Sequence, residues 1–309
     1  MSASEPDTLR ILVTGASGQV GSALPPALAH LGQVTAVGRH QLNLESDDSI
    51  RACVLALRPG LIVHTAAYTA VDKAESEPEL ARRVNAEAVA TLAHAAGQVG
   101  AAMLHYSTDY VFDGAKPTPY VEQDPPRPLS VYGQTKLAAE RALAAAPIAS
   151  IVLRVSWVYA ATGKNFLATI LRLAHERPEL RIVDDQRGAP TSAPQIAHGT
   201  AQLLEHALRH ARATGATLQQ VLAARRGVYH MVAQGETTWC GFARAILQAA
   251  GIAGVPVHPI ATSEYKTAAR RPLNSRLNCE KIAAAFGVRL TPWDTALQEV
   301  LAAVEPPPS

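Results

Sequence analysis

Residues 10–21 read RILVTGASGQVG, in which five strand-forming residues lead into a GxxGxxG loop. The run RILVT favours an extended strand, and glycines permit a tight turn that lets the backbone approach a pyrophosphate. A helix starting after this loop would offer its free N–H groups and the positive end of its dipole to the phosphates. The alternative is a loop that merely needs glycine conformations. Because a strand precedes the loop and a helix follows it, the stretch predicts a dinucleotide site.

The remainder of the first half alternates apolar runs with alanine-rich helical stretches, which is the βαβ pattern of a parallel sheet. We therefore expect an α/β fold with a Rossmann-type doubly wound parallel sheet. The predicted strands cover 10–14, 33–37, 61–64, 102–106 and 150–157, and the predicted helices cover 20–31, 46–57, 77–97 and a stretch around Tyr132.

Beyond Lys164 the alternation loosens, which predicts a smaller C-terminal substrate-binding lobe. Helical stretches at 166–176 and 193–212 are separated by short extended pieces at 180–183 and 227–230. We expect residues 8–160 to form mainly an NADP(H)-binding domain. Residues 161–305 are expected to form mainly the substrate lobe, with some elements returning to the sheet, and residues 1–7 and 305–309 flexible tails.

Composition limits the partners. The 309 residues are 48% hydrophobic and 17% charged, with a net charge of +2, which is too mild to indicate nucleic acid. No apolar run is long enough to span a membrane, and the N-terminus lacks the apolar core of a signal peptide. Three widely spaced cysteines, Cys53, Cys240 and Cys279, argue against a disulfide framework or a zinc site and favour a reducing cytoplasm.

The stretch SVYGQTKLAAE, residues 130–140, places Tyr132 and Lys136 on one face of a predicted helix. Taken alone, this is an ordinary surface pair. The strand that ends in HYSTDY, however, brings Thr108 to the carboxyl edge of the sheet, where α/β proteins bind ligands. A nearby ammonium would lower the pKa of the phenol, and Tyr132 would then act as a general acid or base worth about 10²–10⁴ in rate. Thr108 would orient the substrate oxygen, and Lys136 would also hold the nicotinamide ribose.

The end of the second strand indicates which dinucleotide binds. An acidic residue there would hold the ribose hydroxyls of NAD, but the sequence reads Gly38-Arg39-His40. Arg39 is suited to a 2′-phosphate. NADPH is therefore favoured, and use of NADH is left open.

Seven stretches together carry a family resemblance over residues 10 to about 295. The chain resembles the extended short-chain dehydrogenases/reductases and, within them, the reductases that act on dTDP-4-dehydrorhamnose. The stretches are GASGQVG from Gly15, AAYTAVDKAESEPELA from Ala66, HYSTDYVFDG from His105, VYGQTKLAAE from Val131, RVSWVYA from Arg154, DDQRGAPTSA from Asp184 and RPLNSRLN from Arg271.

The resemblance implies an activity and a set of site residues. The activity is reduction of the 4-keto group of a dTDP-sugar to dTDP-L-rhamnose by NADPH or NADH, for carbohydrate biosynthesis, with Tyr132 as the proton donor assisted by Thr108 and Lys136. The implied cofactor contacts are Gly15, Gly18, Gln19, Val20, Gly21, Arg39, Asn43, Leu44, Ala67, Tyr68, Thr69, Tyr106, Tyr132 and Lys136. The implied substrate contacts are Thr108, Asp109, Tyr132, Trp157, Arg271 and Ser275. Asn43 stands where the family often has an aspartate. The resemblance also implies a homodimer and a response to Mg²⁺, although the sequence shows no carboxylate cluster to name as metal ligands.

Two other functions stay open at this point. A dehydratase or epimerase of the same fold would need an acid/base pair, which in that branch comes from a Thr-Asp-Glu run; here Tyr110 follows Asp109. A non-catalytic NADP-binding regulatory subunit would have no need of Tyr132 and Lys136, yet both are present. The nucleotide base and the stereochemistry at C4 of the product cannot be read from residue types.

Overall fold

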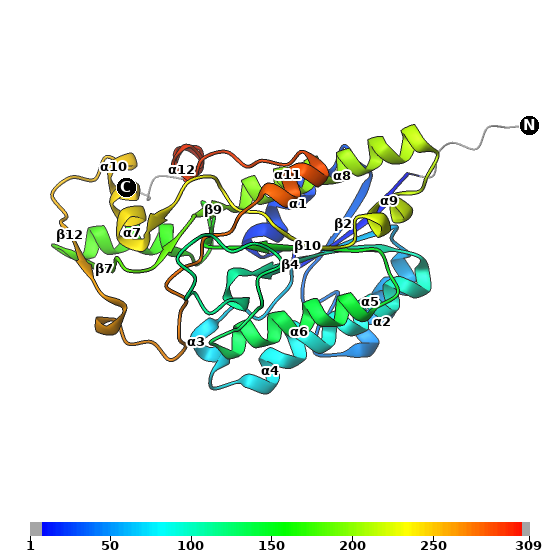
Figure 1. Cartoon of the computed structure of the whole chain (residues 1–309), viewed down its shortest axis with the longest axis horizontal. Coiled ribbons are helices and arrows are strands. Elements are labelled where there is room, and N and C mark those ends of the chain that lie inside the picture. The colour runs from blue at the N-terminus through cyan, green and yellow to red at the C-terminus, as the bar shows by residue number, and fades with distance from the viewer. Residues whose placement is uncertain (1–7, 305–309) are drawn as a thin grey trace, which may run out of the picture.

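The computed structural model describes residues 8–304, so the tails predicted at 1–7 and 305–309 lie outside the described residues. A six-stranded sheet in the order β10-β5-β4-β3-β1-β2 forms the centre of the molecule (Figure 1). All its neighbouring strands pair in parallel. The strands are β1 (Arg10–Thr14), β2 (Gln33–Val37), β3 (Leu61–His64), β4 (Ala102–Thr108), β5 (Ser150–Val155) and β10 (Gly227–His230). Because β2 and β3 lie on opposite sides of β1, the order of the strands reverses there, and a crevice is expected at their carboxyl ends.

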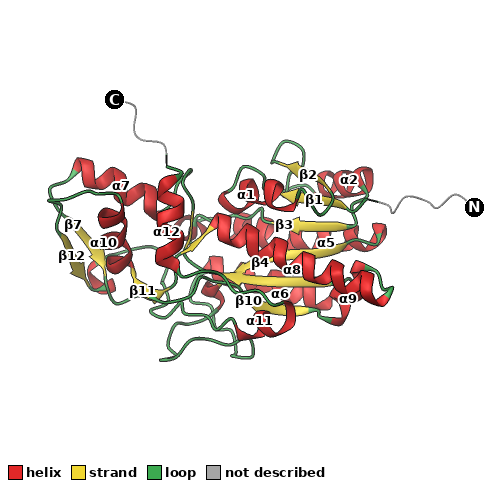
Figure 2. Ribbon diagram, turned by 90° about the horizontal axis from the view of Figure 1, so that it is seen from above, coloured by secondary structure: helices red, strands yellow, loops and turns green. Residues whose placement is uncertain are grey.

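Helices cover both faces of this sheet (Figure 2). One layer contains α1 (Gln19–Leu28), α8 (Ala193–Thr214), α9 (Leu218–Ala224) and α11 (Glu280–Phe286), and the other contains α2 (Asp47–Leu57), α5 (Ala88–Val99) and α6 (Val131–Ala145). Alternate residues of β1 pack against the two helix layers. Ile11 and Val13 belong to the first hydrophobic core, and Leu12 belongs to the second. The predicted Rossmann-type doubly wound sheet is confirmed.

A smaller lobe lies at one end of the sheet (Figure 1). Its core joins residues of α7 (Phe166–Glu176), β7 (Leu180–Val183), α10 (Trp239–Ala249), β12 (Val257–Ile260) and α12 (Trp293–Ala302). Short strands complete the connections: β6 (Val158–Tyr159) pairs with β9 (Thr191–Ser192), and β8 (Arg187–Gly188) pairs with β11 (Thr237–Thr238). A 3₁₀ turn, η3, covers Thr262–Glu264. Four elements of the second half, α8, α9, β10 and α11, lie on the main sheet.

Two predicted elements are interrupted, and in both cases a side chain near the crevice explains the break. The helix predicted at 77–97 consists of α4 (Pro78–Arg82), a π-helical turn η1 (Arg83–Glu87) and α5, after a short α3 (Val71–Ala74). The π turn contains buried Asn85, whose amide bonds the backbone of Tyr68 (2.8 and 3.0 Å). The strand predicted at 150–157 ends at Val155, because Trp157 adopts a left-handed backbone with φ 49°. Within residues 8–304, no helix is both long and apolar enough to cross a membrane.

Candidate active site

The glycine loop after β1 leaves no room for side chains. Gly15 has φ +76°, and a Cβ there would lie 2.7 Å from the backbone nitrogen of Ala66. A Cβ on Gly21 would lie 1.9 Å from the carbonyl oxygen of Gly15. Helix α1 begins after Gly18 without a side-chain cap and without an acidic residue in its first turn. Its first N–H groups and its positive dipole end are therefore available to an anionic ligand, which fits the pyrophosphate of a dinucleotide.

A cleft of about 770 Å³ runs along the carboxyl ends of the strands from this loop. It collects nearly all residues that the sequence assigned to the site. Those that line it are Gly15, Gly18, Gln19, Val20, Gly21, Arg39, Asn43, Leu44, Ala67, Tyr68, Thr69, Tyr106, Thr108, Asp109, Tyr132, Lys136 and Trp157. Arg271 and Ser275 are not among the lining residues.

The end of the cleft that holds the predicted catalytic residues, called the catalytic end, is built where β4 meets the start of α6. After Thr108 the chain forms a 3₁₀ turn, η2 (Asp109–Val111), and the Thr108 hydroxyl accepts the N–H of Tyr110 (3.2 Å). A Cβ on Gly133 would lie 2.2 Å from the carbonyl oxygen of Tyr110, so α6 packs directly on this turn. The rings of Tyr110 and Tyr132 meet edge to face at 5.6 Å. Two segments distant in sequence thus bring Thr108 and Tyr132 together.

The pKa of Tyr132 moves opposite to the sequence-based expectation. Burial raises the pKa of Tyr132 to about 12, and the Asp109 carboxylate adds to the rise, while the Thr108 hydroxyl opposes it. The predicted lowering of this pKa by Lys136 is wrong, because burial and the Asp109 carboxylate determine its direction. The Lys136 ammonium bonds other groups. Its Nζ donates to the carbonyl oxygen of Tyr106 (2.6 Å) and lies 3.2 Å from His105 Nε2. Tyr132 is therefore a protonated phenol at neutral pH, which is the state of a proton donor.

Lys136 ends a row of buried polar side chains that crosses three strands. Thr14, His64 and His105 occupy matching positions on β1, β3 and β4. The Thr14 hydroxyl lies 2.7 Å from His64 Nδ1, and the two imidazoles stack at 5.3 Å. Burial and the Lys136 charge lower the pKa of His64 to about 3 and hold the pKa of His105 well below its usual value. Both rings are neutral. The His105 ring can therefore accept a hydrogen bond from the Lys136 ammonium, and there is no repulsion between two positive charges.

Burial acts on Lys136 itself and on Asp109. It lowers the pKa of Lys136 to about 8, against an opposing effect of the Glu140 carboxylate. It raises the pKa of Asp109 to about 6, although the Ser275 and Thr108 side chains lower it. Three polar atoms of cleft residues, Gln19 Oε1, Asp109 Oδ2 and Ser156 Oγ, are buried and have no hydrogen-bond partner within residues 8–304. A polar ligand in the cleft would supply those partners.

A buried ion pair supports the catalytic end from behind. Glu140 lies on α6, four residues after Lys136, and accepts Arg154 Nε (2.9 Å) and Nη2 (2.6 Å) from β5. The Ser107 hydroxyl of β4 donates to the same carboxylate (2.5 Å). This pair ties the helix that carries Tyr132 to the strand that carries Thr108.

Trp157 forms one wall of the cleft on the side of the small lobe. Its ring stacks on that of Trp239 at 3.7 Å, with 11° between the ring planes. Gly188 lies against the indole, since a Cβ there would come within 2.6 Å of it. Lys164 and Asn165 line the same part of the cleft. The left-handed backbone at Trp157 thus turns a large aromatic surface toward a ligand instead of continuing the strand.

The two predicted substrate residues outside the cleft have other partners. Arg271 forms an ion pair with Asp72 (Nη2–Oδ2 2.6 Å), and the N–H of Ala269 also donates to Asp72 (3.0 Å). This clasp holds residues 269–271 on α3. Ser275 is buried and influences the site through its effect on Asp109.

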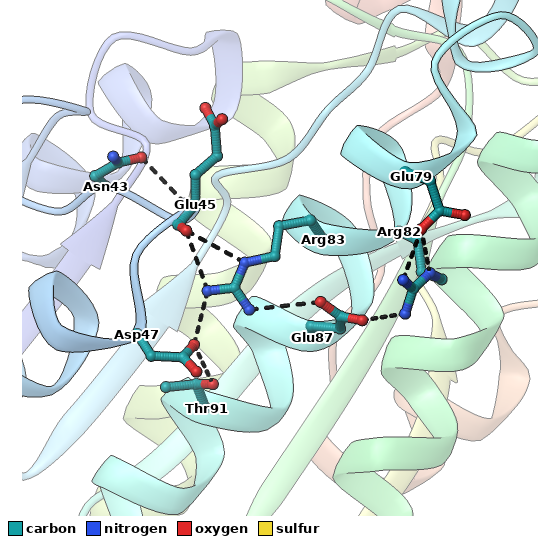
Figure 3. A network of polar contacts seen from close by, with 8 residues as sticks. All are labelled: Asn43, Glu45, Asp47, Glu79, Arg82, Arg83, Glu87 and Thr91. Carbon is teal, nitrogen blue, oxygen red and sulfur yellow. Dashed lines mark hydrogen bonds and ion pairs between the residues drawn. The ribbon is translucent and has the colours of Figure 1, made fainter.

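The opposite end of the cleft, which is predicted to hold the adenine and is called the adenine end, is bordered by exposed charges. Arg39 and Glu45 form an ion pair at its rim, beside Asn43 and Leu44. Helix α2 and the π turn contribute further ion pairs behind them (Figure 3).

Comparison with known proteins decides the family. The model of the family described as "RmlD substrate binding domain" matches residues 9–305. The chain is 47% identical to a dTDP-4-dehydrorhamnose reductase of Burkholderia thailandensis over 94% of this chain and 97% of that protein. It is 43% identical to the Escherichia coli K12 enzyme of the same name, over 95% and 97%. The chain belongs to the dTDP-4-dehydrorhamnose reductase family.

Solved structures of this family have the same architecture. A dTDP-4-dehydrorhamnose reductase of Bacillus anthracis, crystallised in complex with NADP, superposes with a TM-score of 0.84 at 30% identity, over 96% of this chain and 99% of that one. The Clostridium acetobutylicum ortholog superposes with a TM-score of 0.85 at 31% identity, over the same shares of both chains. The family resemblance inferred from the seven sequence stretches is confirmed.

Sequence reasoning about this reductase-family chain missed several residues of the site. Glu140 lies within the stretch that drew attention to Tyr132 and shares a helix face with Lys136, so its spacing could have indicated a role. His64 and His105 each lie at or near the end of a predicted strand, but only the strand register shows that they stack. No sequence pattern indicated that Ser156 would line the cleft. Among residues 8–304, no group of three or more His, Cys, Asp or Glu side chains is arranged to hold a metal ion.

Proposed function

We propose that the protein reduces the 4-keto group of dTDP-4-dehydrorhamnose to give dTDP-L-rhamnose, with Tyr132 as the proton donor. The observation that carries the proposal is a protonated phenol in contact with the Thr108 hydroxyl, at the catalytic end of a cleft whose other end suits a dinucleotide. Membership of the dTDP-4-dehydrorhamnose reductase family supports the substrate.

The chain's own groups divide the work of binding the cofactor. The free N–H groups at the start of α1 would hold the pyrophosphate. Asn43 and Leu44 would contact the adenine, Arg39 the ribose 2′ position, and residues 67–69 the middle of the dinucleotide. The Asn85 amide fixes the backbone of Tyr68 in that middle segment. When bound, NADPH or NADH supplies the hydride that reduces the carbonyl carbon.

Tyr132 and Thr108 would act on the carbonyl oxygen. The Thr108 hydroxyl orients this oxygen, and the Tyr132 phenol gives it a proton while the carbon receives the hydride, so that a phenolate remains on the enzyme. The Lys136 ammonium, anchored by Tyr106 and His105, would hold the nicotinamide ribose beside Tyr132. Its pKa of about 8 keeps most of it charged at neutral pH.

Substrate contacts follow from the remaining polar groups and the indole wall. Asp109 Oδ2 lacks a partner within the described residues and could accept a sugar hydroxyl, and Trp157 offers its ring face. Arg271 would reach the dTDP pyrophosphate only by exchanging its Asp72 partner, and Ser275 would act through Asp109. With its free thiols, the protein is proposed to work in the cytoplasm.

The test is substrate-dependent oxidation of NADPH. Wild-type protein should consume NADPH with dTDP-4-dehydrorhamnose and should consume none with dTDP-glucose, which has no keto group. Product analysis should give the L-rhamno sugar; the 4-epimer would show another reductase of the same fold. Binding of NADPH without any oxidation would establish the non-catalytic regulatory function instead.

A further inference from the structure

Two opposite charges face each other at the rim of the cleft, at the end proposed to hold the adenosine ribose of the dinucleotide. The Arg39 guanidinium, whose side chain is 78% exposed, forms an ion pair with the Glu45 carboxylate, whose side chain is 38% exposed. Both residues line the cleft. An acidic residue at this place favours the free ribose hydroxyls of NAD, and an arginine favours the 2′-phosphate of NADP. This chain has one of each.

Hydrogen bonds hold the backbone of Glu45, whereas the Arg39 side chain is the more exposed of the two. The Asn43 side chain accepts the N–H of Glu45 (3.0 Å), and Arg83 donates twice to the Glu45 carbonyl oxygen (3.2 and 3.3 Å) (Figure 3). Arg83 is held in turn by Asp47 (2.8 Å), which also accepts the Thr91 hydroxyl.

The π turn is what aims this arginine at the loop. Arg83 is the first residue of η1, and its side chain spans to the segment between β2 and α2. π turns inside helices often occur at functional sites. Arg39, in contrast, has Glu45 as its only ion-pair partner within residues 8–304. The backbone that carries the Glu45 carboxylate is therefore anchored by Asn43 and Arg83, whereas the two charged groups are held by each other.

We infer that Glu45 is a specificity residue that offsets Arg39, so that the cleft accepts both dinucleotides. The Glu45 carboxylate would accept the 2′-hydroxyl of NADH, and it would repel the 2′-phosphate of NADPH. Arg39 would attract that phosphate but must first leave Glu45 or share its N–H groups between the two anions. The inference rests on the proposed function only in requiring a nicotinamide dinucleotide in this cleft.

The competing role for Glu45 is to orient Arg39 toward the phosphate. The two roles predict opposite effects of neutralising Glu45 on the affinity for NADPH relative to NADH. If Glu45 opposes the phosphate, its neutralisation strengthens NADPH binding relative to NADH. If it only orients Arg39, its neutralisation weakens NADPH binding most.

The experiment measures dissociation constants of NADPH and NADH by titration without any sugar, at low and high salt. Glu45→Gln should shift the NADPH-to-NADH affinity ratio about five- to tenfold toward NADPH, since a carboxylate near a dianion contributes on that order at a wet surface. The shift should shrink at high salt because exposed charges are screened. Arg39→Gln should shift the ratio toward NADH.

Glu87→Gln is the matched control. Glu87 pairs with Arg82 and Arg83 in the same network and has the same 38% side-chain exposure as Glu45, but it does not line the cleft. The NADPH-to-NADH affinity ratio of Glu87→Gln should equal that of the wild type. An unchanged ratio in Glu45→Gln, a shift toward NADH, or an equal shift in Glu87→Gln would overturn the inference. Wild-type protein that binds dinucleotides but oxidises none with sugar would overturn only the proposed function.

Discussion

The two ends of the cleft use the same kinds of side chain in opposite surroundings. At the adenine end, Arg39 and Glu45 pair at the surface, where an ion pair contributes about 0–1 kcal/mol. At the catalytic end, Lys136, Asp109 and Glu140 are all at most 5% exposed. Burial there shifts the pKa values of Lys136 and Asp109 by about two units or more. We therefore propose that the exposed end tunes which cofactor binds. The buried end sets protonation states and holds the proposed catalytic groups in place.

The largest expected effect is at the buried pair behind the active site. Glu140→Gln should lower the free energy of unfolding by about 3–5 kcal/mol, because Arg154 is left buried without its counter-ion. Urea denaturation measures this. Glu87→Gln makes the same change at the surface and should alter the stability by less than about 1 kcal/mol. Equal losses of unfolding free energy in Glu140→Gln and Glu87→Gln would show that burial does not make the Glu140 pair more important for stability than an exposed pair.

Asp109 should give the next largest effect, with a defined dependence on pH. Its pKa is raised by burial from 3.8 to about 6, so between these values the folded protein binds a proton that the unfolded chain has lost. Stability should therefore fall as the pH rises through this window.

Asp109→Asn removes this slope and should be more stable than the wild type at pH 7, by on the order of 1–3 kcal/mol. Asp113 provides a control of opposite sign, since a backbone hydrogen bond from Ala115 and the Tyr120 hydroxyl lower its pKa. Asp113→Asn should lose stability at neutral pH. Denaturation curves from pH 4 to 7 that run parallel for the wild type and Asp109→Asn would contradict the assignment.

The sequence predicted the sheet and most cleft residues because these follow local rules. Strand runs, the glycine loop and residues at strand ends can all be recognised in the sequence itself. Parallel strands then bring their carboxyl ends to one edge of the sheet. What it could not predict depends on contacts across the fold. The pKa of Tyr132 rises because the fold buries the phenol and places Asp109 near it, and neither follows from the spacing of Tyr132 and Lys136.

The same limit explains the other differences. The π turn contains Asn85, which bonds the backbone of Tyr68, and the left-handed Trp157 stacks on Trp239. The local sequence predicts neither contact. The sequence predicted Arg271 as a substrate contact, but the fold pairs it with Asp72, which lies 199 residues earlier in the chain.

Lys136 should control the alkaline side of the pH–rate profile. Because burial lowers the pKa of Lys136 to about 8, kcat/KM should be level near neutrality and fall about tenfold per pH unit well above 8, as the ammonium is lost. Glu140 raises this pKa, so Glu140→Gln, where it remains folded, should move the fall to lower pH. A profile that stays flat to pH 9.5 would show that the Lys136 charge is not needed.

The smallest effect on stability is expected at the Asp72–Arg271 clasp, whose two side chains are partly exposed to solvent. Asp72→Asn should change the free energy of unfolding by about 1 kcal/mol or less, measured by thermal unfolding against Glu236→Gln, which breaks the similar Arg276 pair. A loss above about 3 kcal/mol would mean that the clasp behaves like the buried end of the cleft.

Tyr132 provides the most direct test of the central claim that a protonated phenol donates the proton. The measurement is the single-turnover rate of NADPH oxidation by dTDP-4-dehydrorhamnose in Tyr132→Phe and in Tyr110→Phe, the neighbouring ring in edge-to-face contact at 5.6 Å. Tyr132→Phe should be slower by about 10²–10⁴ with an unchanged dissociation constant for NADPH, and Tyr110→Phe should stay within about tenfold of the wild type. A Tyr132→Phe variant that reduces the sugar at the wild-type rate would contradict the account.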